Sequence, residues 1–206
     1  MQKFTTLRGI AAPLMRANID TGAIIAPIYM LSRSIDLGQK LFANWRYDLD
    51  GAENADFVLN QPRYRNSEIL IAGPNFGCGS SREGAVWALM RFGIRCVIAP
   101  SFGDIFHENA FKNGVLLITL SEADIASLAK TLAAANDPSL TVDLERCVIE
   151  SAQGLSIPFV LAPARRAALL EGLDEIGATL RSGDEIESFQ ERERLARPWI
   201  YARPRS

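Results

Sequence analysis

The segment from Glu68 to Leu120 alternates short apolar runs with helix-length segments, and this alternation constrains the fold more than any other feature. The runs are too short for helices and are apolar throughout, which is typical of strands covered on both faces. Strands joined by helical segments pack as an α/β fold with at least some parallel strands. We predict strands at 68–72, 95–99 and 115–119, and helices at 85–92, ending at Gly93, and at 104–112, ending at Asn113-Gly114.

The pattern changes on either side of this segment. Ser121 and Asp124 predict the start of a helix to about Ala135, followed by short strands at 141–144, 147–150 and 155–160. A helical region follows from Pro163 to about Arg194, with breaks expected at Gly172, Gly177 and Gly183. The N-terminal part reads as a strand at 7–14, then loops and short elements to Asn66.

Length and composition fit one globular domain. The 206 residues are 48% hydrophobic, enough to bury a core. We therefore expect a single domain over 1–206, with a helical C-terminal extension from about 163 and an Arg-rich tail at 192–205.

Charge and cysteine usage exclude several function classes. The net charge is -2 and the basic residues are scattered until the tail, so no nucleic-acid partner is expected. No apolar run has signal-peptide or membrane-spanning length, so we expect a cytoplasmic protein without a membrane partner. Cys78, Cys96 and Cys147 are widely spaced and form no CxxC pair, which indicates neither a disulfide framework nor a metal site in this chain.

The glycine-rich loop from Gly73 to Glu83 is the most informative stretch. It is not a P-loop because it has no Lys, and it is not a dinucleotide fingerprint because Arg82 stands where a third glycine is needed. It is not a nucleophile elbow because neither Ser80 nor Ser81 is flanked by the required pair of glycines.

What remains is a loop that delivers Ser80, Ser81 and Arg82 to a helix N-terminus, where free N–H groups favour an anion such as a carboxylate. Arg82 offers a two-point fork for that carboxylate, and the positive potential helps a serine hydroxyl transfer a proton. The alternative is structural: Ser80 or Ser81 caps the helix and Glu83 is a first-turn charge. The residues alone leave both interpretations open.

The loop also resembles a known family. Asn75 to Glu83, followed by Trp87-Ala88-Leu89, is similar to the signature loop of 3-isopropylmalate dehydratase small subunits, which belong to the aconitase family. Further segments match that family in order and spacing: 44–47, 57–64, 98–106, 111–114 and 169–180.

The resemblance implies a swivelling β/β/α domain, equivalent to the mobile last domain of aconitase. It implies docking on a large subunit that carries a four-iron four-sulfur cluster, with no metal or cofactor bound by this chain. The implied activity is that of a hydro-lyase, active only with the large subunit, that isomerises 2-isopropylmalate and 3-isopropylmalate in leucine biosynthesis. The implied site has Ser80 as the catalytic base, with Ser81, Arg82, Asp20 and Thr21 binding the substrate.

The chain departs from the family pattern at two site positions. Gly84 stands where the family usually has His, and Gly22 stands where it usually has a second Asp. These departures leave two alternatives to the isopropylmalate reaction: a related hydroxy-diacid substrate (methylmalate/citraconate or homoaconitate), or a non-catalytic paralogue. Specificity in the family is associated with the loop at about 27–33, and the apolar run 28–31 would suit an apolar substituent.

Three further side chains stand out but are not assigned to the site. His107, the only histidine, belongs to no family motif, so we expect a surface or packing role. Trp45 and Trp87 are expected to be core or interface anchors.

Overall fold

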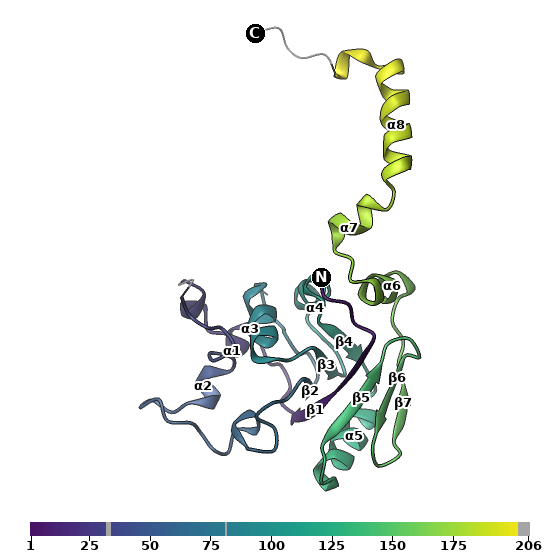
Figure 1. Cartoon of the computed structure of the whole chain (residues 1–206). Helices are drawn as coiled ribbons and strands as arrows, with labels where there is room; N and C mark the ends of the chain where they lie inside the picture. Colours follow the sequence, from purple (N-terminus) through teal and green to yellow (C-terminus); the bar gives the residue numbers. More distant parts are fainter. Residues whose placement is uncertain (32–33, 81, 202–206) are drawn as a thin grey trace. The chain divides into compact units, whose positions relative to one another are not determined.

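The computed structural model describes residues 1–31, 34–80 and 82–201, so Ser81 lies outside the described residues. The chain divides into two compact units, which we call the core unit (Met1–Gly172) and the tail unit (Leu173–Ser206). Figure 1 shows the elements of both units. Each unit is described by itself.

A seven-stranded sheet in the order β4-β3-β2-β1-β5-β6-β7 forms the centre of the core unit. Strands β1 to β4 are parallel to one another, whereas β5, β6 and β7 extend the sheet in antiparallel fashion from β1. The predicted α/β fold with parallel strands is therefore confirmed. The strands are β1 (Thr6–Leu14), β2 (Ile69–Ala72), β3 (Cys96–Ala99), β4 (Leu116–Thr119), β5 (Ser139–Asp143), β6 (Val148–Ser151) and β7 (Ser156–Pro158).

The parallel half of the sheet is covered on both faces. Leu70 and Val97 lie in one apolar cluster together with buried residues of α3 (Gly84–Phe92) and α4 (Asp104–Asn113). Their neighbours Ile69 and Ile98 lie in a second cluster with α5 (Glu122–Ala134) and with Leu169 of α6 (Pro163–Glu171). Because successive strand residues point to opposite faces of the sheet, strands that are covered on both faces are apolar at every position. This explains why these strands appear in the sequence as unbroken apolar runs.

The helix ends follow the expected signals. Gly93 and Gly114 close α3 and α4 in the left-handed conformation that glycine adopts most easily. Ser121 caps α5 by accepting a hydrogen bond from the backbone N–H of Asp124 at 3.1 Å, as predicted. Arg63 closes the other end of α5 by donating to the carbonyl of Leu132 at 2.6 Å. Arg63, which lies in the family-like segment 57–64, thus helps to satisfy the carbonyl groups at the C-terminal end of α5.

Residues 15–66 form loops and short elements, as predicted: α1 (Thr21–Ile24), η1 (Pro27–Met30), α2 (Ala43–Arg46) and η2 (Val58–Asn60). Apolar side chains anchor this region to the sheet, and Ile24 and Phe42 among them are fully buried. Trp45 stacks on Phe42 with ring centroids 5.6 Å apart, so its predicted role as an anchor is confirmed.

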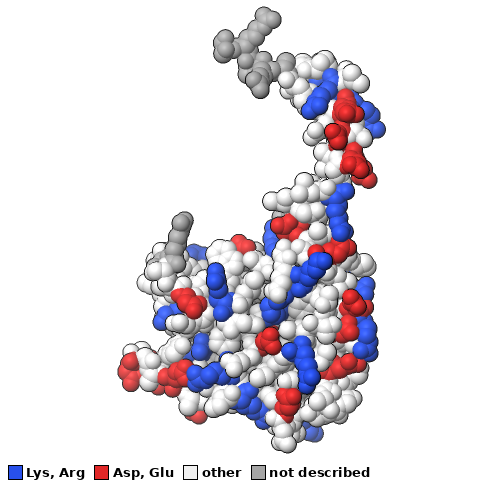
Figure 2. Space-filling view, viewed as in Figure 1, with Lys and Arg blue, Asp and Glu red and all other residues white. Residues whose placement is uncertain are grey.

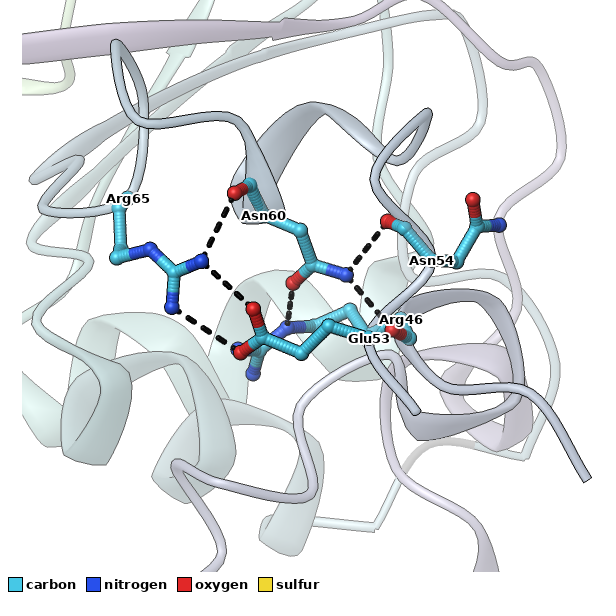
Figure 3. Close-up of polar contacts among 5 residues, drawn as sticks. All are labelled: Arg46, Glu53, Asn54, Asn60 and Arg65. Carbon is cyan, nitrogen blue, oxygen red and sulfur yellow. Dashed lines mark hydrogen bonds and ion pairs between the residues drawn. The ribbon is translucent and has the colours of Figure 1, made fainter. Parts of the chain in front are cut away.

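A polar network fixes the 46–65 loop (Figure 3). Arg46 is only 6% exposed, and its Nε donates to Asn60 Oδ1 at 3.0 Å. Asn60 Nδ2 donates in turn to the carbonyls of Arg46 and Asn54 at 2.6 and 2.8 Å. Burial lowers the pKa of the Arg46 guanidinium, and the nearby Glu53, held by Arg65, opposes that shift. Arg46 and Asn60, which lie in the family-like segments 44–47 and 57–64, therefore stabilise the conformation of this loop.

The tail unit consists of α7 (Glu175–Leu180), α8 (Gly183–Ala196) and η3 (Pro198–Ile200). Helix breaks occur at Gly172, which caps α6, and at Gly183, where α8 begins. The break expected at Gly177 is wrong. Gly177 lies inside α7, where its N–H donates to the capping Asp174 at 2.7 Å. The single-domain organisation with an extension from about 163 stays a prediction; the first helix of that region, α6, belongs to the core unit.

Charges of both signs are interspersed on the face of the molecule seen in Figure 2. Among the described residues, no helix combines the length and apolar character needed to cross a membrane.

His107 packs between α4 and α6. Its Nδ1 contacts Arg165 Nη1 at 2.5 Å, and its ring meets Phe102 edge-on. Its predicted packing role is confirmed by these contacts. Burial and the neighbouring Arg165 lower the pKa of His107, while Glu108 and Asp104 oppose the shift.

This lowered pKa predicts a loss of stability in mild acid. The folded chain binds fewer protons at His107 than the unfolded chain, so stability is complete above the unfolded pKa of about 6.5 and falls below it. We expect the melting temperature, measured by circular dichroism, to fall more between pH 7.5 and pH 5.5 in the wild type than in His107→Gln. Equal losses in the two proteins would contradict this expectation.

Candidate active site

The glycine-rich loop follows β2 at the carboxyl ends of the parallel strands, where loops from neighbouring strands meet. One side of it is joined to the segment after β1. The Gly77 N–H donates to the Ile19 carbonyl at 2.7 Å, and the Thr21 N–H donates to the Cys78 carbonyl at 3.2 Å. These bonds place α1 directly beside the loop.

The other side of the glycine-rich loop is joined to the loop after β3. The Phe76 N–H donates to the Ser101 carbonyl at 3.0 Å, and the Gly103 N–H donates back to the Phe76 carbonyl at 2.9 Å. The Asn75 N–H also donates to Ser101 Oγ at 2.8 Å. Three loops that are far apart in the sequence thus form one hydrogen-bonded layer.

Gly77 shows why the loop needs glycine. Its φ of +75° is unfavourable for other residues, and a Cβ there would lie 2.5 Å from Cδ1 of the fully buried Phe106. Phe106 also meets Phe76 edge-on at a centroid distance of 5.4 Å. The loop therefore rests directly on the aromatic core.

A hollow of about 160 Å³ lies beside this layer. It brings together three of the predicted site residues, Thr21, Ser80 and Arg82, and the last two are exposed. The remaining lining is Gly22, Ile25, Pro27, Met30 and Ala85.

Asp20 lies next to the hollow and has a structural contact of its own. Its Oδ1 accepts a hydrogen bond from the Ala23 N–H at 2.7 Å and caps α1. One carboxylate oxygen is thus engaged in holding the turn that presents Thr21. The fifth predicted residue, Ser81, falls outside the described residues.

The capping alternative is wrong for Ser80. Helix α3 begins at Gly84, its N-cap position is Glu83, and no side chain among the described residues caps it. Ser80 therefore lies before the cap position and faces the hollow. Glu83, expected as a first-turn charge, instead accepts a hydrogen bond from Asn113.

Met30 occupies the space beside Gly84. A Cβ on residue 84 would overlap Met30 Sδ and lie 3.2 Å from its Cγ. Within the apolar run 28–31, Met30 lines the hollow, whereas Ile28 and Leu31 are 67% and 83% exposed. The wall next to Ser80 is consequently apolar.

The close approach predicts coupling between residues 84 and 30. Gly84→Ala gains up to about 1 kcal/mol of helix propensity but must displace the Met30 thioether. We expect Gly84→Ala to be more favourable in a Met30→Ala background, with a coupling of about 0.5–3 kcal/mol in urea unfolding. Additive effects of the two changes would show that Met30 does not fill this space in solution.

Comparison with known proteins identifies the family. The aconitase C-terminal domain family matches residues 1–123, and the C-terminal domain of 3-isopropylmalate dehydratase small subunits matches residues 175–203. A 3-isopropylmalate dehydratase small subunit of Rhodospirillum centenum is 52% identical over 200 residues, covering 97% of this chain and 98% of the relative. The corresponding protein of Afipia carboxidovorans is 49% identical over 201 residues, covering 97% and 100%.

The chain belongs to the 3-isopropylmalate dehydratase small-subunit family. The predicted aconitase-type swivel fold is confirmed by a crystal structure of a 3-isopropylmalate dehydratase of Methanocaldococcus jannaschii. That structure has a TM-score of 0.62 and 25% identity, and the match covers 90% of this chain and 99% of the other.

Cys78, Cys96 and Cys147 are free cysteines in the structure. Among the described residues, no group of three or more His, Cys, Asp or Glu side chains is placed to hold a metal ion. Cys96 is fully buried in the sheet, and burial raises the pKa of its thiol. Within the described part of the chain, the donors thus do not fit an iron–sulfur cluster, and no reaction step is assigned to one on this chain.

The sequence analysis did not assign two of the residues that line the hollow, Ile25 and Ala85, and it did not predict that Met30 lies against Gly84. No local pattern distinguishes an apolar residue that lines a hollow from one that packs in a core. The association of the 27–33 loop with specificity was the only available signal, and it pointed to the correct segment for Pro27 and Met30.

Proposed function

We propose that this chain is the small subunit of a hydro-lyase that interconverts 2-isopropylmalate and 3-isopropylmalate in leucine biosynthesis. The observation that carries the proposal is the convergence of Ser80, Arg82 and Thr21 on one hollow, in a chain about half identical to small subunits of that name along nearly its whole length.

Each side chain has a role that its chemistry supports. Ser80 Oγ accepts the proton removed from the carbon next to the hydroxyl-bearing carbon, and returns it in the reverse step. Arg82 pairs with a substrate carboxylate through two N–H donors and stabilises negative charge on Ser80 Oγ. Thr21, presented by the Asp20 cap, and Ser81 provide further polar contacts to the substrate.

The size of the hollow supports a second subunit. Small-molecule sites typically measure about 300–1,000 Å³, and this hollow of about 160 Å³ is open to solvent on the side of Ser80 and Arg82. We infer that a large subunit completes the site. A four-iron four-sulfur cluster on that partner would supply Lewis-acid activation of the substrate hydroxyl. We also infer a cytoplasmic location for the pair.

The apolar wall bears on the substrate. Ile25, Pro27 and Met30 offer contact to an apolar substituent such as an isopropyl group, whereas Gly22 and Gly84 offer no side-chain donors. The runner-up substrates are the related hydroxy-diacids methylmalate/citraconate and homoaconitate, and the third possibility is a non-catalytic paralogue that retains the fold.

One assay separates these possibilities. The chain is co-expressed with the large subunit of its own organism, purified anaerobically, and assayed with 2-isopropylmalate, 2-methylmalate and homoaconitate. The proposal expects turnover of 2-isopropylmalate at the highest kcat/KM. A higher value for another diacid would support the runner-up, and an intact but inactive pair that contains the cluster would support the paralogue.

The tail unit is expected to contribute to docking on the large subunit. None of its described side chains is buried. Large apolar side chains are therefore exposed to solvent: Ile176 and Leu180 are each 71% exposed, Trp199 is 68% exposed and Phe189 is 54% exposed. Isolated helices as short as α8 are marginally stable in water. Exposed apolar side chains of this kind are typical of a surface that packs against a partner protein.

Deletion of residues 173–206 tests this expectation. The core unit keeps both apolar clusters and should therefore fold, with a melting temperature close to that of the full chain. Affinity for the large subunit should fall by at least about 100-fold, as expected when several buried anchors of 1–2 kcal/mol each are lost. Association measured by light scattering or calorimetry with unchanged affinity would assign the docking surface to the core unit alone.

A further inference from the structure

We propose that Asn113, at the end of α4, is a positioning residue for the serine loop, the part of the glycine-rich loop that carries Ser80 and Arg82, and that it holds this part in its working geometry through Glu83. The inference rests on the proposed function for its kinetic consequence, and on the structure for the contact itself.

Asn113 is bound on both ends of its side-chain amide. Its Nδ2 donates to Glu83 Oε1 at 2.7 Å and to the Asn109 carbonyl at 2.8 Å, while its Oδ1 accepts from Trp87 Nε1 at 3.1 Å. Rotating the amide by 180° would direct its oxygen at two acceptors and its NH₂ group at the indole donor. The amide therefore has one favourable orientation.

The contact joins two elements that the sequence places far apart. Glu83 immediately follows Arg82 and occupies the N-cap position of α3, whereas Asn113 is the last residue of α4, where the left-handed Gly114 ends the helix. The position of Asn113 is thus fixed by the helix end and by the start of β4.

The Asn113 contact adds a side-chain anchor to the backbone hydrogen bonds that hold the serine loop. The Cys78 carbonyl is bound by the Thr21 N–H at its near end, and the Glu83 carboxylate is bound by Asn113 at its far end. Ser80 and Arg82 lie between these anchors. The far end is also held by backbone hydrogen bonds at the start of α3, from the Ala85 N–H to the Arg82 carbonyl at 3.1 Å and from the Val86 N–H to the Glu83 carbonyl at 2.9 Å. Loss of the Asn113 contact leaves these bonds in place but releases the Glu83 side chain, and the directions of Ser80 Oγ and the Arg82 fork are then less constrained.

The exposure of Glu83 and Trp87, the two side chains bound to Asn113, allows a positioning role to be distinguished from a role in folding stability. Glu83 is exposed, Trp87 is 46% exposed, and neither belongs to the buried core. Exposed hydrogen bonds contribute little to folding, so removing this one leaves the melting temperature nearly unchanged. Misplacement of a reacting group by about 1 Å, in contrast, lowers turnover by about 100-fold.

The experiment uses the reconstituted pair with four variants of this chain: Asn113→Ala, Glu83→Ala, the double variant, and Glu83→Gln, which retains an acceptor oxygen for Asn113. The matched control is Asn109→Ala on the same helix, which keeps the Asn109 carbonyl. Each single Ala change at 113 or 83 is expected to lower kcat by about 10- to 100-fold. The double variant should be no worse than the poorer single variant, because both changes remove the same contact. Glu83→Gln and Asn109→Ala should stay near the native rate.

A second readout does not depend on activity. In the ¹⁵N-labelled chain, Asn113→Ala should shift the Trp87 indole N–H resonance and speed hydrogen exchange at the amides of Ser80 and Arg82, whereas Asn109→Ala should do neither. Additive kinetic losses, a near-native kcat for Asn113→Ala, or unchanged amide exchange would overturn the inference. A wild-type pair that turns over no hydroxy-diacid would overturn the proposed function, and the exchange measurement would still decide the positioning role.

Discussion

Replacement of Ser80 by alanine is expected to lower turnover of the reconstituted pair by about two to four orders of magnitude, the usual effect of losing a general base. The substitution removes only a hydroxyl group from an exposed loop residue that does not cap α3. Folding and association with the large subunit should therefore stay intact. The measurement is kcat and KM under anaerobic conditions, with the melting temperature of each variant recorded beside them.

Ser156→Ala is the matched control, since Ser156 is an exposed serine on β7 and takes no part in the three-loop layer. It should turn over substrate at the native rate. A near-native rate for Ser80→Ala would remove Ser80 from the role of base. Loss of the complex instead of turnover would make the serine loop an interface element.

The second large effect is expected at Gly77. Alanine there must adopt a φ of +75° and place its Cβ against the ring of Phe106, which is fully buried. The left-handed conformation costs about 1–2 kcal/mol and overpacking a further 1–3 kcal/mol. In a unit of this size the sum corresponds to a decrease in melting temperature of roughly 5–15 °C. Thermal unfolding followed by circular dichroism measures it.

Gly154→Ala separates the two contributions. Gly154 also has a positive φ, +85°, but nothing lies within 4 Å of a Cβ there. Its substitution should cost only about 1–2 kcal/mol, the conformational part alone. Similar losses at residues 77 and 154 would show that the Phe106 ring moves aside without penalty, and that the loop does not rest on the core as tightly as described.

The elements of the fold could be predicted because their signals are local. A fully buried parallel strand reads as an unbroken apolar run, and Gly93, Gly114 and Gly172 mark helix ends because each adopts the left-handed conformation there. Gly177 was misread because a glycine signals an end only in that conformation, and in α7 it is helical and held by the Asp174 cap. The sequence shows the residue type but not the backbone angle.

The candidate site could be predicted only in part, because its contacts are long-range. The resemblance identified the segments of Thr21, Ser80 and Arg82, and the fold brings all three to one hollow. Nothing local indicates that Met30 fills the space beside Gly84, or that Asn113 reaches Glu83. Such pairs depend on how α3 packs against its neighbours, which no single segment specifies.

The central place of β1 in the sheet has a consequence for how the chain folds. This strand, near the N-terminus, pairs with Ile69–Ala72 on one edge and with Ser139–Asp143 on the other. Both ladders join segments far apart in sequence, so loop-closure entropy must be overcome before either is formed, and folding is expected to be slow. During synthesis, the backbone N–H and C=O groups of β1 that pair with β5 stay unpaired until most of the core unit has left the ribosome. The period of greatest aggregation risk for this protein is therefore set by the arrival of β5, the last partner of its first strand.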